Sequence, residues 1–221
     1  MDFITELEQV FHENASTERA IPMEAYMKNN FPFLGIKTTP RRAIFKEIWK
    51  LHHEEVSLNS REIALKLYKK KEREFHYCAI EILIKELKKK YQKDDIQLIE
   101  TLIITHSWWD SVDTIAKYLL GNYLVQFPEE ISTIANRFSN SDNMWLNRSA
   151  IIFQLDYKAE TDFKLLSAIC KKHKDSKEFF IQKAIGWALR DYSRFNPKGI
   201  TDFVTKTDLK PLSKREALRN I

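Results

Sequence analysis

The sequence predicts an all-α protein. Apolar residues recur at spacings of three and four along the whole chain, and the alternation typical of strands is not sustained anywhere. The 221 residues include only 4 glycines and 6 prolines, so few positions interrupt a helix. Hydrophobic residues make up 43% and charged residues 30%, which is enough to bury a core and solvate the outer helix faces. We therefore expect one helical domain over residues 1–221.

The helix starts are marked by capping and proline signals. Pro40 falls in the first turn of one helix, and Pro128, Pro197 and Pro211 open later ones, because the missing N–H of proline costs nothing there. Ser107-x-x-Asp110 resembles a capping box. The expected helices, in order, are 2–14, 20–30, 40–54, 60–71, 73–90, 94–104, 108–126, 128–138, 142–156, 161–173, 177–193, 197–206 and 212–220.

Short connections between helices of similar length make neighbouring helices pack antiparallel. A row of such hairpins, each burying its face on the next, is an α-α superhelix, or solenoid, of the HEAT or armadillo kind. The repeat itself is weak in the sequence, so this architecture is inferred from helix spacing.

Several function classes lack support. Cys78 and Cys170 form no CxxC pattern, and His52-His53-Glu54-Glu55 are adjacent residues whose side chains diverge around a helix, so we expect no metal. No phosphate-binding glycine loop, GxSxG or HExxH motif is present, and we expect no nucleotide or other cofactor. The acidic N-terminus and the lack of a long apolar run predict a soluble cytoplasmic protein that does not enter membranes. A monomer suffices.

Positive charge is concentrated in one segment. The net charge is +5 and the isoelectric point is near 9.0. Residues 171–198 hold eight bases and three acids, a difference of five, so this segment carries the whole excess. A basic segment of this kind favours an anionic partner.

Trp109 and Asp113 stand out from the expected core. At 100° per residue, Trp108, Val112, Ile115 and Leu119 form one apolar stripe. Trp109 and Asp113 lie four residues apart and project together about 100° away from that stripe. The ordinary alternative is a core tryptophan with a carboxylate near the helix dipole, and the pair alone does not exclude it.

Two further helices carry unusual polar residues. Lys183, Trp187 and Arg190 fall at i, i+4 and i+7, a basic-aromatic-basic stripe that suits a nucleic acid, although a Trp beneath Lys and Arg stems is an equally ordinary reading. Arg148 lies on an otherwise apolar helix, where its guanidinium needs a partner. Either Asp113 or a DNA phosphate could serve.

With these residues identified, the chain resembles the AlkD-like family of DNA alkylpurine glycosylases, which are built of HEAT-like repeats. The resemblance spans nearly the whole chain. It rests on Tyr26-Met27-Lys28-Asn29, Phe33-Leu34-Gly35-Ile36-Lys37-Thr38 with Pro40, Ser107-Trp108-Trp109-Asp110-x-Val112-Asp113, Trp145-x-x-Arg148, and Gly186-Trp187-x-Leu189-Arg190.

The resemblance implies a glycosylase that releases 3-methyladenine and 7-methylguanine from duplex DNA without flipping the damaged nucleotide into a pocket. It implies catalytic roles for Asp113, Trp109 and Trp187, and DNA contacts for Tyr26 and Arg148. The residues also expected to contact DNA are Lys37, Arg41, Arg42, Lys183, Arg190 and Arg194. Thr39, inserted before Pro40, departs from the family pattern and affects the local phosphate contacts.

These residue types suit that reaction. An alkylated purine cation leaves as a neutral base, so no general acid is needed, and positive charge develops on the deoxyribose as in glycoside hydrolysis. An ionised Asp113 can face this charge and orient water, and the indoles can add cation–π contacts. Two alternatives stay open: a family member that binds DNA structures without cleaving, and a HEAT-type scaffold for a protein partner.

Overall fold

A computed structural model describes residues 1–219, which form helices and no strand, and this confirms the all-α prediction. The chain divides into two compact units, one from Met1 to Lys90 and a second that begins at Tyr91. Each unit is described by itself. The expected single solenoid over 1–221, and its HEAT-like character, stay predictions. No helix in the described part of the chain is long and apolar enough to cross a membrane.

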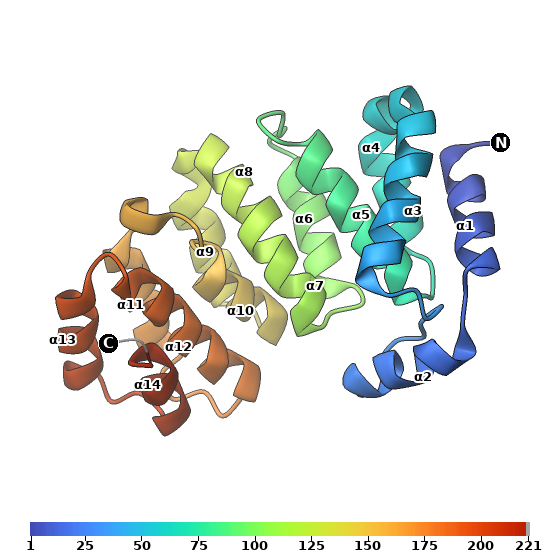
Figure 1. The fold of residues 1–221 in the computed structure, drawn as a ribbon. Coiled ribbons are helices and arrows are strands. Elements are labelled where there is room, and N and C mark those ends of the chain that lie inside the picture. The colour runs from blue at the N-terminus through green and yellow to red at the C-terminus, as the bar shows by residue number, and fades with distance from the viewer. Residues whose placement is uncertain (220–221) are drawn as a thin grey trace. The chain divides into compact units, whose positions relative to one another are not determined.

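In the first unit, α1 packs on α3 and α4, and α4 packs on α3 and α5, while α2 lies apart from this row (Figure 1). Helix α1 shows why they form: Asp2 caps its N-terminus by accepting the Thr5 N–H, and Phe3, Leu7 and Phe11, at i, i+4 and i+8, are fully buried. The helices are α1 (Phe3–Glu13), α2 (Thr17–Tyr26), α3 (Thr38–Leu51), α4 (His53–Tyr68) and α5 (Arg73–Glu86).

In the second unit, α10 packs on both α9 and α12, and α12 is also covered by α14. Pro128, Pro197 and Pro211 begin their helical segments as predicted. The helices are α6 (Asp95–Ile104), α7 (Trp109–Thr114), the π-helical segment η1 (Ile115–Leu120), α8 (Gly121–Gln126), the 3₁₀ turn η2 (Pro128–Glu130), α9 (Ile131–Ser139), α10 (Met144–Ile152), the 3₁₀ turn η3 (Lys158–Glu160), α11 (Phe163–Lys172), α12 (Phe179–Ser193), α13 (Pro197–Lys206) and α14 (Pro211–Ala217).

Apart from helix ends that lie up to four residues from their predicted positions, the structure differs from the predicted elements in three places. Helix α4 begins at His53 and kinks at Asn59, where a break was expected. The expected helix 108–126 contains the π-helical segment η1, which begins two residues after Asp113 and which a 3.6-residue period cannot reveal. The predicted capping box is wrong: Trp108 is the N-cap residue of α7, and the Ser107 hydroxyl donates to the Ile103 carbonyl instead.

Candidate functional site

Asp113 and Arg148 form a two-point ion pair in the second unit. The Arg148 Nε lies 2.7 Å from Asp113 Oδ1, and its Nη2 lies 2.8 Å from Oδ2. The arginine comes from α10 and the aspartate from α7, and the two helices pack on each other. Arg148 is 4% exposed, so this parallel pair is shielded on the arginine side.

Arg148 also connects this pair to helix α12. Its Nη1 donates to the backbone carbonyl of Phe180. The Phe180 ring lies 5.2 Å from the Trp108 ring and 5.1 Å from the Trp145 ring, centroid to centroid. These three rings form an aromatic cluster beside the ion pair, and the Arg148 guanidinium lies 5.9 Å from the Phe180 ring centroid. The Arg148 guanidinium is therefore held by the Asp113 carboxylate of α7 and by the backbone of α12.

The prediction that Arg148 contacts DNA needs correcting. Its guanidinium is buried and already bonded to Asp113 and to the Phe180 carbonyl, so the structure does not present it to a phosphate. The sequence left open whether Asp113 or a DNA phosphate is the partner of Arg148, and in the structure the partner is Asp113.

Two opposing effects act on the Asp113 carboxyl. Burial raises its pKa above the ordinary value, while the hydrogen bonds and charge of Arg148 lower it, and the net direction is upward. The nearby charge of Asp110 adds a smaller upward effect. Arg148 is therefore the group that favours the ionised carboxylate in this buried setting.

Trp109 and Trp187 are both partly exposed, as expected for residues outside the core stripes. Trp109 lies one turn before Asp113 on α7. Trp187 lies seven residues after Phe180 on α12, which puts the two on one helix face about 10 Å apart along the axis. Because Phe180 faces the aromatic cluster, Trp187 extends the same face of α12 beyond that cluster. Val112, Ile115 and Leu119 are fully buried, as predicted.

The two cations that flank Trp187 have a carboxylate partner. Glu216 of α14 lies 3.1 Å from the Lys183 Nζ through Oε1 and 2.8 Å from the Arg190 Nη1 through Oε2. Both cations hold the pKa of Glu216 below its ordinary value, mainly through the hydrogen bond from Arg190. Lys183 and Arg190 stay partly exposed, with side-chain exposures of 37% and 20%. No local pattern in the sequence points to Glu216, which is 26 residues from Arg190.

Gly186 makes this arrangement possible. A β-carbon there would lie 2.4 Å from the Cβ of Glu216 and 3.0 Å from the carbonyl oxygen of Ser213. No side chain fits between α12 and α14 at this point. The sequence motif around Gly186 is thus tied to the close approach of α14.

A family model described as "DNA alkylation repair enzyme" matches residues 7–221. This chain belongs to the DNA alkylation repair enzyme family. A solved structure titled "Predicted DNA alkylation repair enzyme from Enterococcus faecalis" is 32% identical, with a TM-score of 0.86 over 94% of this chain and 96% of that one. A search of curated proteins found no match. The family name implies DNA as the substrate.

The first unit of this family member brings together two of the predicted DNA contacts. Tyr26 and Lys37 line one groove of about 570 Å³, beside the α3 N-terminus. Tyr26 is 67% exposed, and Lys37 is the N-cap residue of α3. Both are accessible to a large ligand.

Arg41 is buried, contrary to the prediction that it contacts DNA, whereas the DNA contact of Arg42 stays a prediction. Arg41 is 3% exposed, with its Nη2 2.7 Å from Glu81 Oε1, because its place on α3 turns it toward α5. Its guanidinium is therefore a core ion pair rather than a surface cation. Arg42 is exposed at 63% of its side chain and shares the same carboxylate at 2.9 Å.

Helix α3 carries a second basic stripe, which was not among the predicted DNA contacts. Arg42, Lys46 and Lys50 fall at i, i+4 and i+8 on α3 and line a groove of about 650 Å³. Lys85 of α5 lines it too, with its Nζ 4.2 Å from the centroid of the Trp49 ring. The i, i+4, i+8 spacing of bases was visible in the sequence, but the tryptophan floor and Lys85 required the fold.

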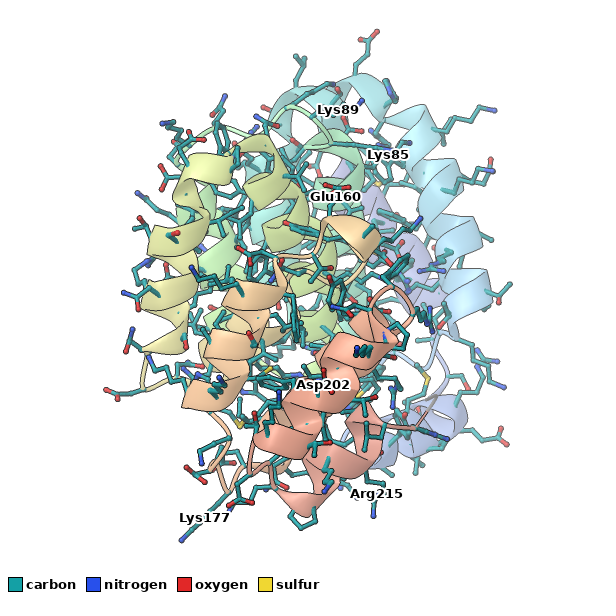
Figure 2. The ribbon with its side chains drawn as sticks, turned by 90° about the vertical axis from the view of Figure 1, so that its left-hand side faces the viewer. Lys85, Lys89, Glu160, Lys177, Asp202 and Arg215 are labelled. Carbon is teal, nitrogen blue, oxygen red and sulfur yellow. The ribbon has the colours of Figure 1, made fainter. Side chains whose placement is uncertain are left out.

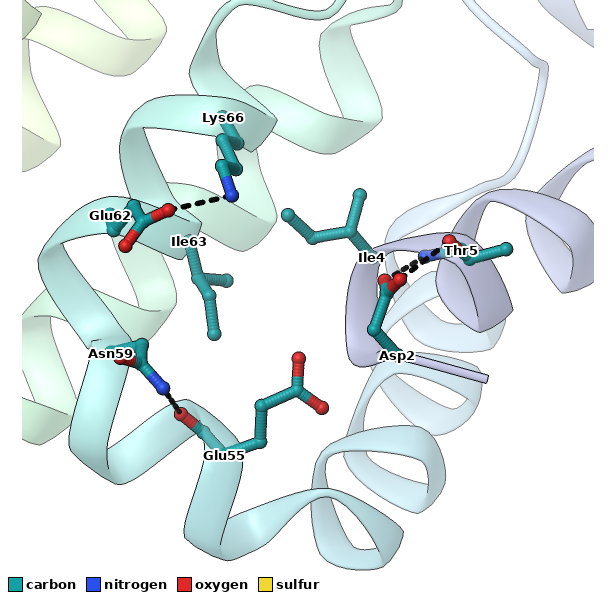
Figure 3. A pocket seen from close by; sticks show the side chains of 8 residues that line it. All are labelled: Asp2, Ile4, Thr5, Glu55, Asn59, Glu62, Ile63 and Lys66. Atoms are coloured by element: carbon teal, nitrogen blue, oxygen red, sulfur yellow. Dashed lines mark hydrogen bonds and ion pairs between the residues drawn. The ribbon is translucent and has the colours of Figure 1, made fainter.

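Another pocket of the first unit is lined mainly by acidic residues. A pocket of about 490 Å³ between α1 and α4 is lined by the carboxylates of Asp2, Glu55 and Glu62, with Lys66 paired to Glu62 (Figure 3). Its excess of acids opposes phosphate binding. The cations Lys37, Arg42, Lys46, Lys50 and Lys85 line the two grooves described above instead.

Proposed function

We propose that the protein is a DNA glycosylase that hydrolyses the N-glycosidic bond of cationic alkylated purines, such as 3-methyladenine and 7-methylguanine, in duplex DNA. The observation that carries the proposal is the Asp113 carboxylate, held at two points by a buried arginine and partly open to solvent. Membership of the DNA alkylation repair family supports DNA as the substrate.

Hydrolysis of this bond requires one ionised carboxylate. The bond between the purine nitrogen and C1′ breaks with its electron pair on the base, so the cationic base leaves neutral and needs no acid. Positive charge develops on the deoxyribose, and preorganised negative charge stabilises it. Water then adds to C1′ and loses a proton to solvent.

The geometry of Asp113 suits both tasks. Each of its oxygens accepts one N–H from Arg148, which leaves a second lone pair on each oxygen for water. The aspartate side chain is 15% exposed, whereas that of Arg148 is 5% exposed, so the open side of the pair is the carboxylate. Arg148 thereby acts as a positioning residue that also favours the ionised form of Asp113 against the effect of burial on its pKa.

The aromatic residues supply a complementary surface. Trp109, one turn from Asp113, and Trp187, on the cluster face of α12, are partly exposed indoles that can lie against a sugar or a cationic base. Each cation–π contact contributes about 0.5–2 kcal/mol, depending on desolvation. That the damaged nucleotide stays out of a pocket rests on the resemblance to the AlkD-like family.

We assign the expected phosphate contacts to exposed or partly exposed cations in each unit. In the second unit these are Lys183, Arg190 and Arg194, and in the first Lys37, Arg42, Lys46 and Lys50. Neutralising phosphates makes DNA affinity fall steeply with salt.

The test measures free base released from methylated duplex DNA by chromatography. We expect Asp113→Asn to reduce release of 7-methylguanine about 100-fold or more while DNA binding persists. Asp202→Asn, the same change on the exposed face of α13, should act like the wild type. Unchanged release by Asp113→Asn contradicts the proposal.

The assay also separates the two alternatives. Salt-sensitive DNA binding with no base release by the wild type indicates a DNA-binding protein without glycosylase activity. Absence of salt-sensitive DNA affinity indicates a scaffold for proteins. Because the substrate's charge supplies much of the reactivity, uracil-containing DNA should be a poor substrate, and comparable rates on it would count against the mechanism.

A further inference from the structure

The Glu216 carboxylate lies between two partly exposed cations, where a bound anion such as phosphate could otherwise lie. One carboxylate oxygen meets Lys183 and the other meets Arg190, two turns apart on α12. Trp187 lies between these cations in sequence. A phosphate group has the same needs as this carboxylate: charge-assisted hydrogen bonds from two cationic donors.

The packing of α14 fixes Glu216 in that position. The Ser213 hydroxyl donates to the Gln182 carbonyl at 3.0 Å, one residue before Lys183. Arg190 also donates to the Glu216 backbone carbonyl at 3.3 Å. With the close approach at Gly186, α14 is held at both ends of the stripe. The carboxylate is therefore preorganised rather than a freely moving surface acid.

The charge balance limits what this stripe offers to DNA. Two cations and one carboxylate leave a net charge of +1 from Lys183, Arg190 and Glu216. A phosphate that approaches either cation competes with the Glu216 carboxylate, which already neutralises part of their charge. This competition lowers the gain from DNA binding and lowers the number of counterions released.

We infer that Glu216 acts as an internal stand-in for a DNA phosphate, which holds Lys183 and Arg190 beside Trp187 in free protein and reduces affinity for unmodified duplex DNA. The inference rests on the proposed DNA contacts of these two cations. It makes Glu216 a residue that lowers the phosphate contribution to affinity on any duplex, so that lesion-specific contacts supply a larger share of the binding free energy.

The experiment measures the affinity of full-length protein for an unmodified duplex of defined length over a series of salt concentrations. Glu216→Gln should bind roughly 2- to 5-fold tighter at low salt, since a partly exposed ion pair no longer has to be broken. The slope of log affinity against log salt should steepen by about one. Glu216→Asp keeps the charge but shortens the side chain, and we expect a smaller increase in affinity.

Asp202→Asn is the matched control, because it removes one negative charge from an exposed position on α13 of the same unit (Figure 2). An equal gain in that variant assigns the effect to net charge and overturns the inference. So does an unchanged slope for a folded Glu216→Gln protein. If that variant unfolds, Glu216→Asp decides: unchanged affinity for the unmodified duplex overturns the inference.

The outcome for the underlying DNA contacts is separate. Lys183→Gln and Arg190→Gln should each weaken affinity and flatten the salt slope. If neither does, the proposed contacts fail. If both do and Glu216→Gln does not tighten binding, only the role of Glu216 fails.

Discussion

Replacing Arg148 by methionine removes the partner of Asp113 and leaves its carboxylate buried. Arg148 makes two hydrogen bonds to Asp113 and one to the Phe180 carbonyl, from a side chain that is 5% exposed. Breaking one side of such a buried pair costs about 3–5 kcal/mol. For a chain of this length each kcal/mol lowers Tm by about 2–4 °C, so we expect a fall of about 6–20 °C near neutral pH.

The variant also has a distinct pH signature. Without Arg148, the remaining influences on Asp113, burial and the Asp110 charge, both raise its pKa. The acid limb of the excision rate should therefore move to higher pH in Arg148→Met. Because the unpaired carboxyl can take up a proton in the folded state, the stability loss should be largest at high pH and shrink as pH falls through the raised pKa.

Two measurements test this: thermal unfolding across pH and single-turnover base release across pH. Arg137→Met is the control, because Arg137 pairs with Glu100 at the surface of the same unit, with 47% of its side chain exposed. Its loss should cost less than about 1 kcal/mol. Equal losses for both variants, or an acid limb that does not move in Arg148→Met, would refute the reasoning.

Three other changes test the framework around the site. Gly186→Ala places a methyl group 2.4 Å from the Cβ of Glu216, so α12 and α14 must separate at a cost of about 1–3 kcal/mol, measured by denaturant unfolding. Because the pKa of Glu216 is lowered in the folded protein, the ionised carboxylate stabilises the fold above the unfolded pKa, and this stabilisation is lost as pH falls through the folded pKa. The difference in unfolding free energy between wild type and Glu216→Gln should therefore close on acidification. A constant difference would contradict this. Glu74→Gln should cost about 1–3 kcal/mol, because the buried carboxylate accepts three consecutive backbone N–H groups of residues 34–36; Glu62→Gln, a control at an exposed carboxylate, should unfold at nearly the same denaturant concentration as the wild type.

The sequence by itself determined the helices and the candidate residues. Helical periodicity depends on local spacing, so the helix order and the buried stripe of Val112, Ile115 and Leu119 were predictable. The same spacing separated Trp109 and Asp113 from that stripe. These are properties of one helix at a time, which a sequence carries without knowledge of its neighbours.

The tertiary structure decided which charges are paired. Arg41 reads as a surface cation, and the sequence left the partner of Arg148 open between Asp113 and a DNA phosphate. In the structure α5 and α7 supply Glu81 and Asp113, which pair with these two buried arginines. Glu216 reaches α12 only because Gly186 admits α14. The π-helical segment after Asp113 also left no periodic signal. Partners that lie 26–40 residues apart meet through packing, and a local pattern holds no record of that distance.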